Sequence, residues 1–395
     1  MSVKQISIKS LILLVSLMGL AGLARAAEIS NLYDYEVPVA SQSPDDRNAA
    51  IGQAMRQVLI KVTGNSRVVG QPALQSLLRN ASQYVLKFTY RLQEAGSDAE
   101  EKRFIRVYFD AASINQKLRS SGLPVWGKSR PQLIAWVGIQ DRSGRQLYIP
   151  DADPGLSNML FSLADSYGIP FLLPLMDLQD QSSISSSDLW GNFIGPLQQA
   201  SSRYLSDMIV VIRLQKNADG YVKSSWSLLD DNESLDWQVN SPSQDDALAQ
   251  GMQKLAGLVA GAYAPAGGSS LEQVVIQVNG VTGFDAMVKL QNYLAQLESV
   301  ETLLVRSIQE NKVVFSLNLR GGMQSFKQAV ALSNFIQPAP EAMDPVMMQD
   351  VYTPPEMPEP EPTISGDGEI SAQMPMPEQP APVRLDRIDL YYELK

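Results

Sequence analysis

The segment Gly122–Ser129 matches the pattern G-x-x-x-x-G-K-S, which in nucleotide-binding proteins cradles phosphate groups. Such a loop works when a strand precedes it, a helix follows it, and consecutive backbone N–H groups point at the phosphate. Here the patterns predict a helix before the segment and a strand after it. Pro124 also removes an N–H group, and Trp126 is bulky where backbone must approach. We therefore expect a connector between two folded units, with Trp126 packed between them.

A second candidate is the acidic turn Asp151-Ala152-Asp153-Pro154-Gly155, which resembles the start of a calcium loop. An EF-hand needs an oxygen donor at the fifth position, glycine at the sixth and glutamate at the twelfth. The chain has Gly155, Leu156 and Ser162 there. A turn that leads into a helix explains the segment better. The acidic run 230–233 is likewise predicted to be a hairpin turn.

The chain contains no histidine and no cysteine. This composition excludes a Ser-His-Asp triad, zinc sites built on histidine or thiolate, and a thiol nucleophile. No lysine has a serine three positions before it, so the Ser-x-x-Lys motif is also excluded. Paired carboxylates remain, but they are too common in sequences to identify a site. We assign no catalytic, cofactor-binding or metal-ligating residue and expect no cofactor.

The N-terminus has the order of a secretory signal peptide. Lys4 and Lys9 precede an apolar run over 11–23, and small residues follow up to Ala26. The run has 13 residues, fewer than the roughly 20 that a membrane-spanning helix needs. We expect residues 1–26 to be removed by cleavage between Ala26 and Ala27, which places the mature protein in the periplasm. An uncleaved membrane anchor is the alternative. No later segment is apolar for long enough to span a membrane.

The remaining patterns predict an α+β, multidomain protein with small mixed or antiparallel sheets and helices packed on them. The first unit, residues 27–128, shows the order strand, helix, helix, strand, strand, helix. Its first helix begins at Ser43-Pro44, a strong capping pair, and ends before Gly64. The predicted elements cover 32–39, 43–63, 72–80, 84–92, 104–110 and 112–121.

The second unit, residues 131–264, combines buried strands, helices and a meander of three strands. An apolar strand over 169–175 contains two prolines, which argue for an edge position. The next helix is predicted to carry one apolar stripe from Trp190 to Tyr204, and residues 208–212 are typical of a central strand. The other predicted elements are strands over 132–139, 221–229 and 235–239, and helices over 156–163 and 246–262.

The third unit, residues 271–336, shows the order strand, helix, strand, strand, helix, which is typical of a ferredoxin-like fold. No closing strand is evident directly after it. Residues 337–384 form an acidic segment rich in proline and methionine, with 12 of the 24 prolines between positions 338 and 382. Such a composition predicts a disordered linker.

Residues 385–395 then have the alternation of a strand. We expect this strand to return to the third unit's sheet, because a free apolar strand is an aggregation hazard. Addition to the edge of a partner's sheet is the alternative.

The first two units together resemble a family of exported Gram-negative proteins known as domain of unknown function 2066. The resemblance covers most of the chain up to about residue 335 and implies an exported location but no known activity. The matching residues are Val37–Val39, Val58–Gly64, Asn80-Ala81, Tyr84-Val85, Gly122–Gly127, Arg130-Pro131, Leu173–Asp177 and Ala200–Tyr204.

These observations favour a non-enzymatic binding or adaptor protein of the cell envelope. Its partner would be an envelope protein or peptidoglycan. No basic patch indicates a nucleic acid. One alternative is a hydrolase that uses carboxylates on envelope glycans, and another is a structural spacer that uses its acidic, proline-rich segment. The identity of the partner and the oligomeric state stay open.

Overall fold

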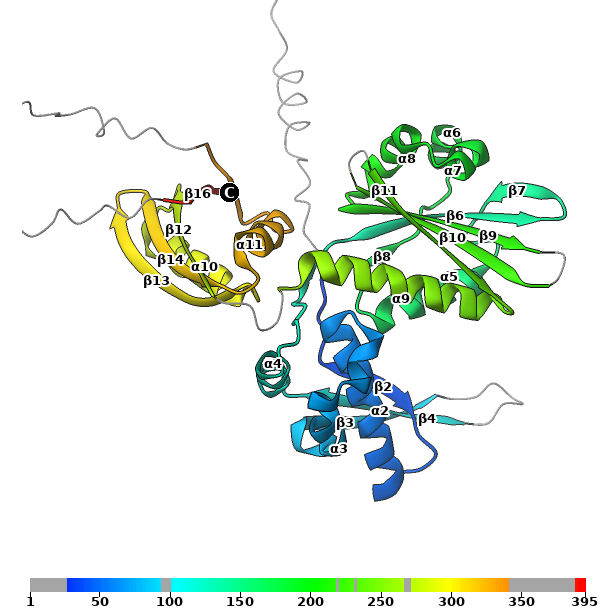
Figure 1. The fold of residues 1–395 in the computed structure, drawn as a ribbon, viewed down its shortest axis with the longest axis horizontal. Coiled ribbons are helices and arrows are strands. Elements are labelled where there is room, and N and C mark those ends of the chain that lie inside the picture. The colour runs from blue at the N-terminus through cyan, green and yellow to red at the C-terminus, as the bar shows by residue number, and fades with distance from the viewer. Residues whose placement is uncertain (1–26, 94–100, 218–219, 231–232, 266–270, 341–387) are drawn as a thin grey trace, which may run out of the picture.

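The computed structural model describes residues 27–93, 101–217, 220–230, 233–265, 271–340 and 388–395. They form an α+β, multidomain arrangement with three mixed or antiparallel sheets and helices packed against them (Figure 1). A further two-stranded pairing joins β1 (Ala27–Glu28) to β5 (Ser129–Arg130). The predicted fold class is therefore confirmed. The predicted signal peptide with Ala26, and most of segment 337–384, lie outside the described residues. No helix in the described ranges combines the length and apolar character needed to cross a membrane.

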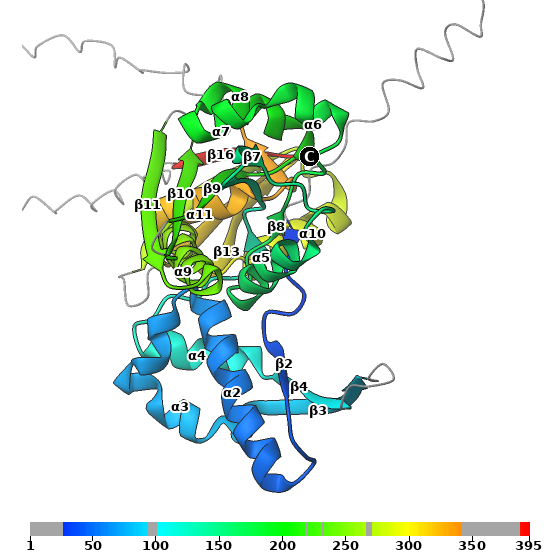
Figure 2. The same cartoon turned by 90° about the vertical axis from the view of Figure 1, so that its right-hand side faces the viewer.

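The first unit has a three-stranded antiparallel sheet in the order β2-β4-β3, and helix α2 packs across it (Figure 2). The caps of α2 are the predicted ones. The Ser43 hydroxyl accepts a hydrogen bond from the Asp46 N–H group, and Gly64 ends the helix at φ 63°. The elements are β2 (Asp34–Pro38), α2 (Pro44–Thr63), η1 (Ser66–Gly70), η2 (Pro72–Leu74), α3 (Gln75–Arg79), η3 (Ala81–Tyr84), β3 (Val85–Gln93), β4 (Lys102–Phe109) and α4 (Ala111–Ser120).

The second unit has a mixed sheet in the order β11-β10-β9-β6-β7, with β8 also paired to β6. Helices α5 and α9 cover one face, whereas α7 and α8 cover the other, so each face has its own apolar core. Strand β9 is central, as predicted. The elements are β6 (Leu133–Asp141), β7 (Gly144–Leu147), α5 (Pro154–Ser166), β8 (Phe171–Leu172), α6 (Leu178–Ser183), α7 (Ser186–Gly191), α8 (Ile194–Ser201), η4 (Ser202–Tyr204), β9 (Met208–Lys216), β10 (Val222–Asp230), β11 (Glu233–Ser241) and α9 (Gln244–Tyr263).

Two predictions for this unit are wrong in detail. The apolar strand over 169–175 is reduced to β8, because Pro170 and Pro174 flank it and cannot donate to a ladder. The predicted stripe from Trp190 to Tyr204 does not lie on one helix. Asn192 adopts the left-handed conformation at φ 55°, which ends α7 and starts α8 in a new direction.

The third unit contains the predicted strand, helix, strand, strand, helix order and two further strands. Strand β15 follows the second helix directly, so the closing strand that the sequence did not reveal does exist. The last strand, β16, joins this same sheet, whose order is β13-β14-β12-β16-β15. The elements are β12 (Glu272–Asn279), α10 (Gly283–Gln296), β13 (Val300–Gln309), β14 (Lys312–Leu319), α11 (Gly322–Ala331), β15 (Ile336–Pro338) and β16 (Leu390–Leu394).

Candidate functional site

The segment 123–128 joins the first unit to the second, as expected for the pattern at Gly122–Ser129. Helix α4 precedes it, and the two-residue strand β5 (Ser129–Arg130) follows it. The Trp126 N–H group donates to the Val62 carbonyl at the end of α2, 2.7 Å away, and the Trp126 side chain is buried. The loop therefore lacks the following helix that a phosphate cradle requires.

Trp126 packs where α2 of the first unit meets α9 of the second. A methyl group added to Gly64 would lie 2.3 Å from Ala260 Cβ and 3.1 Å from the Trp126 ring. Gly64 is thus required twice, for its left-handed backbone and for the close approach of the two helices. The prediction that Trp126 packs between the units agrees with this contact.

Arg130 lies at the centre of this contact between the first and second units, which we call the joint, and its side chain is 0% exposed. Its guanidinium lies 3.9 Å from the centre of the Trp126 ring and donates only to backbone carbonyls. The acceptors are Lys61 O and Trp126 O at 2.8 Å, Gly168 O at 2.8 Å, and Gly127 O and Tyr167 O at 2.9 Å. Burial lowers the pKa of Arg130 to about 9, so the group stays charged at neutral pH. It therefore ties α2, the connector and the end of α5 together.

The third unit meets the first through Glu298, whose carboxylate forms an ion pair with Arg119 on α4. The backbone of Gly127 lies beside the same side chain, because a methyl group there would be 2.6 Å from Glu298 Cγ. The Arg320 guanidinium donates to the Glu298 carbonyl at 3.1 Å. The connector thus touches all three units.

A cavity of about 790 Å³ opens at this junction. Its walls come from the first unit, the connector, the end of α9 and the third unit. The aromatic lining consists of Tyr33, Trp126, Tyr263, Tyr293 and Phe335. The volume falls within the range of roughly 300–1,000 Å³ that small-molecule sites occupy, and such sites are mostly apolar with a few polar groups.

The polar groups of this junction cavity are mainly neutral. The Tyr33 hydroxyl donates to Asn115 Oδ1 at 2.7 Å. Burial, with the nearby charge of Glu298, raises the pKa of Tyr33 to about 12, and burial does the same for Tyr293. Gln296, Ser333 and Asn334 add amide and hydroxyl groups.

Two side chains of the cavity lining carry a charge. Among the described residues, Glu298 is the one carboxylate of this lining and Lys128 the one ammonium group. The cavity can therefore hold a polar, largely uncharged ligand with apolar faces.

A second polar cluster lies on the outer face of the second unit. The Arg203 guanidinium donates two hydrogen bonds of 2.8 and 2.9 Å to the Asp177 carboxylate and one of 3.1 Å to the Asp180 carboxylate. The Tyr204 hydroxyl donates to the buried Asp180 carboxylate and accepts from the Leu175 N–H group. Arg203 holds the pKa of Asp177 at about 2. The two motifs Leu173–Asp177 and Ala200–Tyr204 are thereby brought together.

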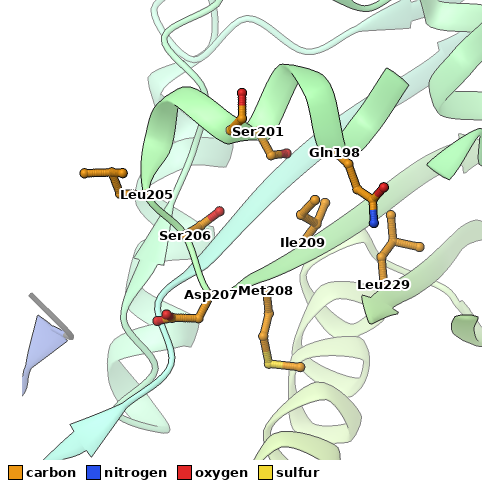
Figure 3. Close-up of a pocket in the computed structure, with 9 residues that line it drawn as sticks. Gln198, Ser201, Leu205, Ser206, Asp207, Met208, Ile209 and Leu229 are labelled. Carbon is orange, nitrogen blue, oxygen red and sulfur yellow. The ribbon is translucent and has the colours of Figure 1, made fainter. Parts of the chain in front are cut away.

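Beside this cluster lies a smaller cavity of about 190 Å³ (Figure 3). Two of its polar groups already have protein partners: Asp207 Oδ2 accepts from the Gln132 N–H group at 2.7 Å, and Ser201 Oγ accepts from the Trp136 ring at 2.8 Å. It is also smaller than the range of ligand sites. The candidate site is therefore the junction cavity.

The other sequence candidates have structural roles. Asp153 caps α5 by accepting from the N–H groups of Gly155 and Leu156, as expected for a turn that leads into a helix. Of the acidic run 230–233, Asp230 ends β10 and pairs with Glu233, which begins β11, and residues 231–232 lie outside the described ranges. In the described part of the chain, no three Asp or Glu side chains gather in a way that could hold a metal ion.

Sequence reasoning gave no role to Arg130, Glu298 or the tyrosines of the junction cavity. Backbone carbonyls are the partners of Arg130, and they carry no sequence identity. An arginine flanked by a connector and a buried strand, with no acidic residue nearby, is the one hint that the sequence offers.

Comparison with known families adds one finding. A family model described as a domain of unknown function, DUF8605, matches residues 26–127, which correspond to the first unit and the connector up to Gly127. No curated protein sequence matches the chain. The matched family is a domain of unknown function other than the one that the sequence resembles, and the match ends at the glycine that faces Glu298.

Proposed function

We propose that the chain is an exported, non-enzymatic binding or adaptor protein of the cell envelope, and that it holds its ligand in the junction cavity. One observation carries the proposal: a cavity of about 790 Å³ exists where three units meet, and it combines aromatic faces with amide and hydroxyl groups. Sites at the meeting of domains with this composition typically bind small molecules.

Export is supported by the basic, apolar and small-residue order of residues 1–26 and by the resemblance to the exported family known as domain of unknown function 2066. The N-terminal residue of the mature chain tests it. Mass spectrometry of protein from the periplasmic fraction should give a chain that begins at Ala27. A full-length chain in the cytosol would refute export.

A glycan hydrolase needs two carboxylates about 5 Å or about 6.5–9.5 Å apart across its cleft. Glu298 lines the junction cavity without a second carboxylate from the described residues, and it is engaged by Arg119. This favours binding over hydrolysis at this site. The spacer hypothesis depends on residues 338–382, of which 341–382 lie outside the described ranges.

Peptidoglycan fragments are the first probe, because sugar rings and amides match the lining of aromatic, amide and hydroxyl groups. Calorimetric titration of the leaderless chain with soluble disaccharide-peptide fragments should show saturable binding. Ala111→Trp places a bulky ring in the cavity and should weaken binding at least about tenfold. Ala112→Trp is the matched control, because Ala112 is exposed and does not line the cavity.

Equal affinity of both variants and the parent chain would place the ligand elsewhere. If the parent chain binds no fragment, the same pair of variants is applied to partners cross-linked in the intact envelope. Equal recovery of partners by Ala111→Trp and Ala112→Trp would then refute the assignment of the cavity.

A further inference from the structure

The sheet of the third unit contains one strand more than a ferredoxin-like fold has. In a ferredoxin-like order, the strand after the second helix pairs directly with the first strand and runs antiparallel to it. Strand β15 has that direction relative to β12, because β16 is parallel to β12 and antiparallel to β15. However, β16 lies between the two. Strand β16 thus fills a position one strand wide between β12 and β15, which we call the slot.

Backbone pairing fixes β16 in this slot from both sides. Ile276 to Asn279 of β12 face Leu390 to Glu393 in parallel register, and Ile336 to Pro338 of β15 face Leu394 to Tyr392 in antiparallel register. The pairing continues at both ends. Asp389 N donates to Val275 O and the Asp389 carboxylate accepts from Val275 N, both at 2.8 Å, whereas Lys395 N donates to Phe335 O at 3.1 Å.

Side chains of alternate residues give the slot its specificity. Leu390, Tyr392 and Leu394 turn to the core of the unit, as the period of a strand requires. Tyr392 is 2% exposed, and its ring meets the edge of Phe326 at 6.0 Å between centroids. The slot thus fits an extended segment with the pattern Asp-Leu-x-Tyr-x-Leu.

We propose that this slot is a strand-binding site that also accepts β16 from a second copy of the same chain. A second copy brings the identical side chains and register. The 49 residues between Ala339 and Asp389 set the reach, because a chain of this length spans about 160 Å when extended. Exchange of an identical element between protomers is a common route to assembly. At low concentration the chain's own strand occupies the slot, because tethering gives it an effective concentration in the millimolar range.

The slot also adjoins the junction cavity. The carbonyl of Phe335 anchors Lys395, and the Phe335 ring stacks on Tyr293 at 4.8 Å in the cavity wall. The strand-exchange proposal does not depend on what the cavity binds, and its test uses no ligand.

The chain has no cysteine, so introduced cysteines report on the exchange alone. Gln337 and Glu393 lie directly opposite each other on β15 and β16, and both are exposed. Full-length Gln337→Cys chains are mixed with Glu393→Cys chains under mild oxidation, from about 10 µM to about 1 mM, which reaches the millimolar range of a tethered strand. We expect a disulfide between the two kinds of chain that increases with concentration. It should exceed by at least about tenfold that of the control mixture Lys289→Cys with Glu393→Cys, because Lys289 is exposed on α10, outside the slot.

A synthetic peptide of residues 388–395 is the second arm. In excess it should suppress the cross-link, whereas the same peptide with Tyr392→Ala should need about 100 times the concentration, because a buried aromatic side chain is lost. Cross-linking no faster than the control at every concentration would overturn the proposal. So would a cross-link that excess peptide leaves unchanged.

Discussion

Replacing Arg130 tests whether the joint between the first two units is held by one buried cation. The side chain is 0% exposed and donates to five carbonyls contributed by Lys61, the connector and the end of α5. Arg130→Met keeps most of the apolar stem and leaves all five carbonyls without this donor. Arg130→Lys retains three donors and can serve at most three of them.

The expected loss of stability on replacing Arg130 is the difference between two large contributions to the free energy of unfolding. Each hydrogen bond from a charged group contributes about 1.5–3 kcal/mol to the free energy of unfolding. The desolvation of the buried cation opposes the sum of the five bonds by several kcal/mol. We expect a net loss of about 4 kcal/mol for Arg130→Met and about half of that for Arg130→Lys. For a folded region of this size, each kcal/mol lowers the melting temperature by about 2–4 °C, so Arg130→Met should melt about 10 °C lower.

Scanning calorimetry of the whole chain is the assay, because it resolves separate transitions in a multidomain protein. We expect the first two units to unfold together in the parent chain and separately in Arg130→Met. Arg145→Met is the matched control: Arg145 also lies over an indole ring, that of Trp190 at 4.6 Å, but it is exposed. Its loss should change stability by less than about 1 kcal/mol. If Arg130→Met melts within about 2 °C of the parent chain, the carbonyl network has no net stabilising role.

Three further predictions concern other parts of the chain. Gly251→Ala should destabilise the second unit by about 1–3 kcal/mol, because the new methyl group would lie 2.1 Å from the Trp226 ring, whereas Gly257→Ala on the same helix has open space and should stabilise it by up to about 1 kcal/mol. Urea unfolding compares the two, and equal effects would show that α9 can shift. Asp177→Asn should lower the melting temperature at pH 5 but not near pH 2, because the lowered pKa of Asp177 gives a contribution that is present above pH 4 and lost as the pH falls toward 2. A pH-independent difference would contradict the role of Arg203. Finally, absorbance at 295 nm should show four tyrosines that ionise only near pH 12. Because their pKa values are raised in the folded chain, they contribute stability that is present below pH 10 and lost as the pH rises toward 12. Complete titration of all tyrosines near pH 10 in the folded chain would refute the burial of these four. They are Tyr33, Tyr204, Tyr293 and Tyr392.

Local patterns predicted most of the elements, because their physical causes are local. The α2 helix is an example: Ser43, Pro44 and Gly64 determine both of its ends within the segment itself. The meander and the strand, helix, strand, strand, helix order of the third unit follow in the same way from alternation and turn residues.

The sequence missed features that depend on contacts between distant segments. Strand β15 has three residues, too few for a pattern, and it is a strand because β16 lies beside it. The break at Asn192 depends on a left-handed residue that is not glycine. The junction cavity arises from the way in which three units meet, and no segment of the chain contains it.

The ring of carbonyls around Arg130 has a consequence for the order of assembly. Its acceptors belong to the end of α2, the connector and the end of α5. Because these segments lie in two units, we expect the acceptors to converge only after both units have folded. Interactions that form late slow unfolding and leave the folding rate almost unchanged. The Arg130 contacts should therefore slow the unfolding of the paired units without speeding their folding, so that they lengthen the lifetime of the assembled pair.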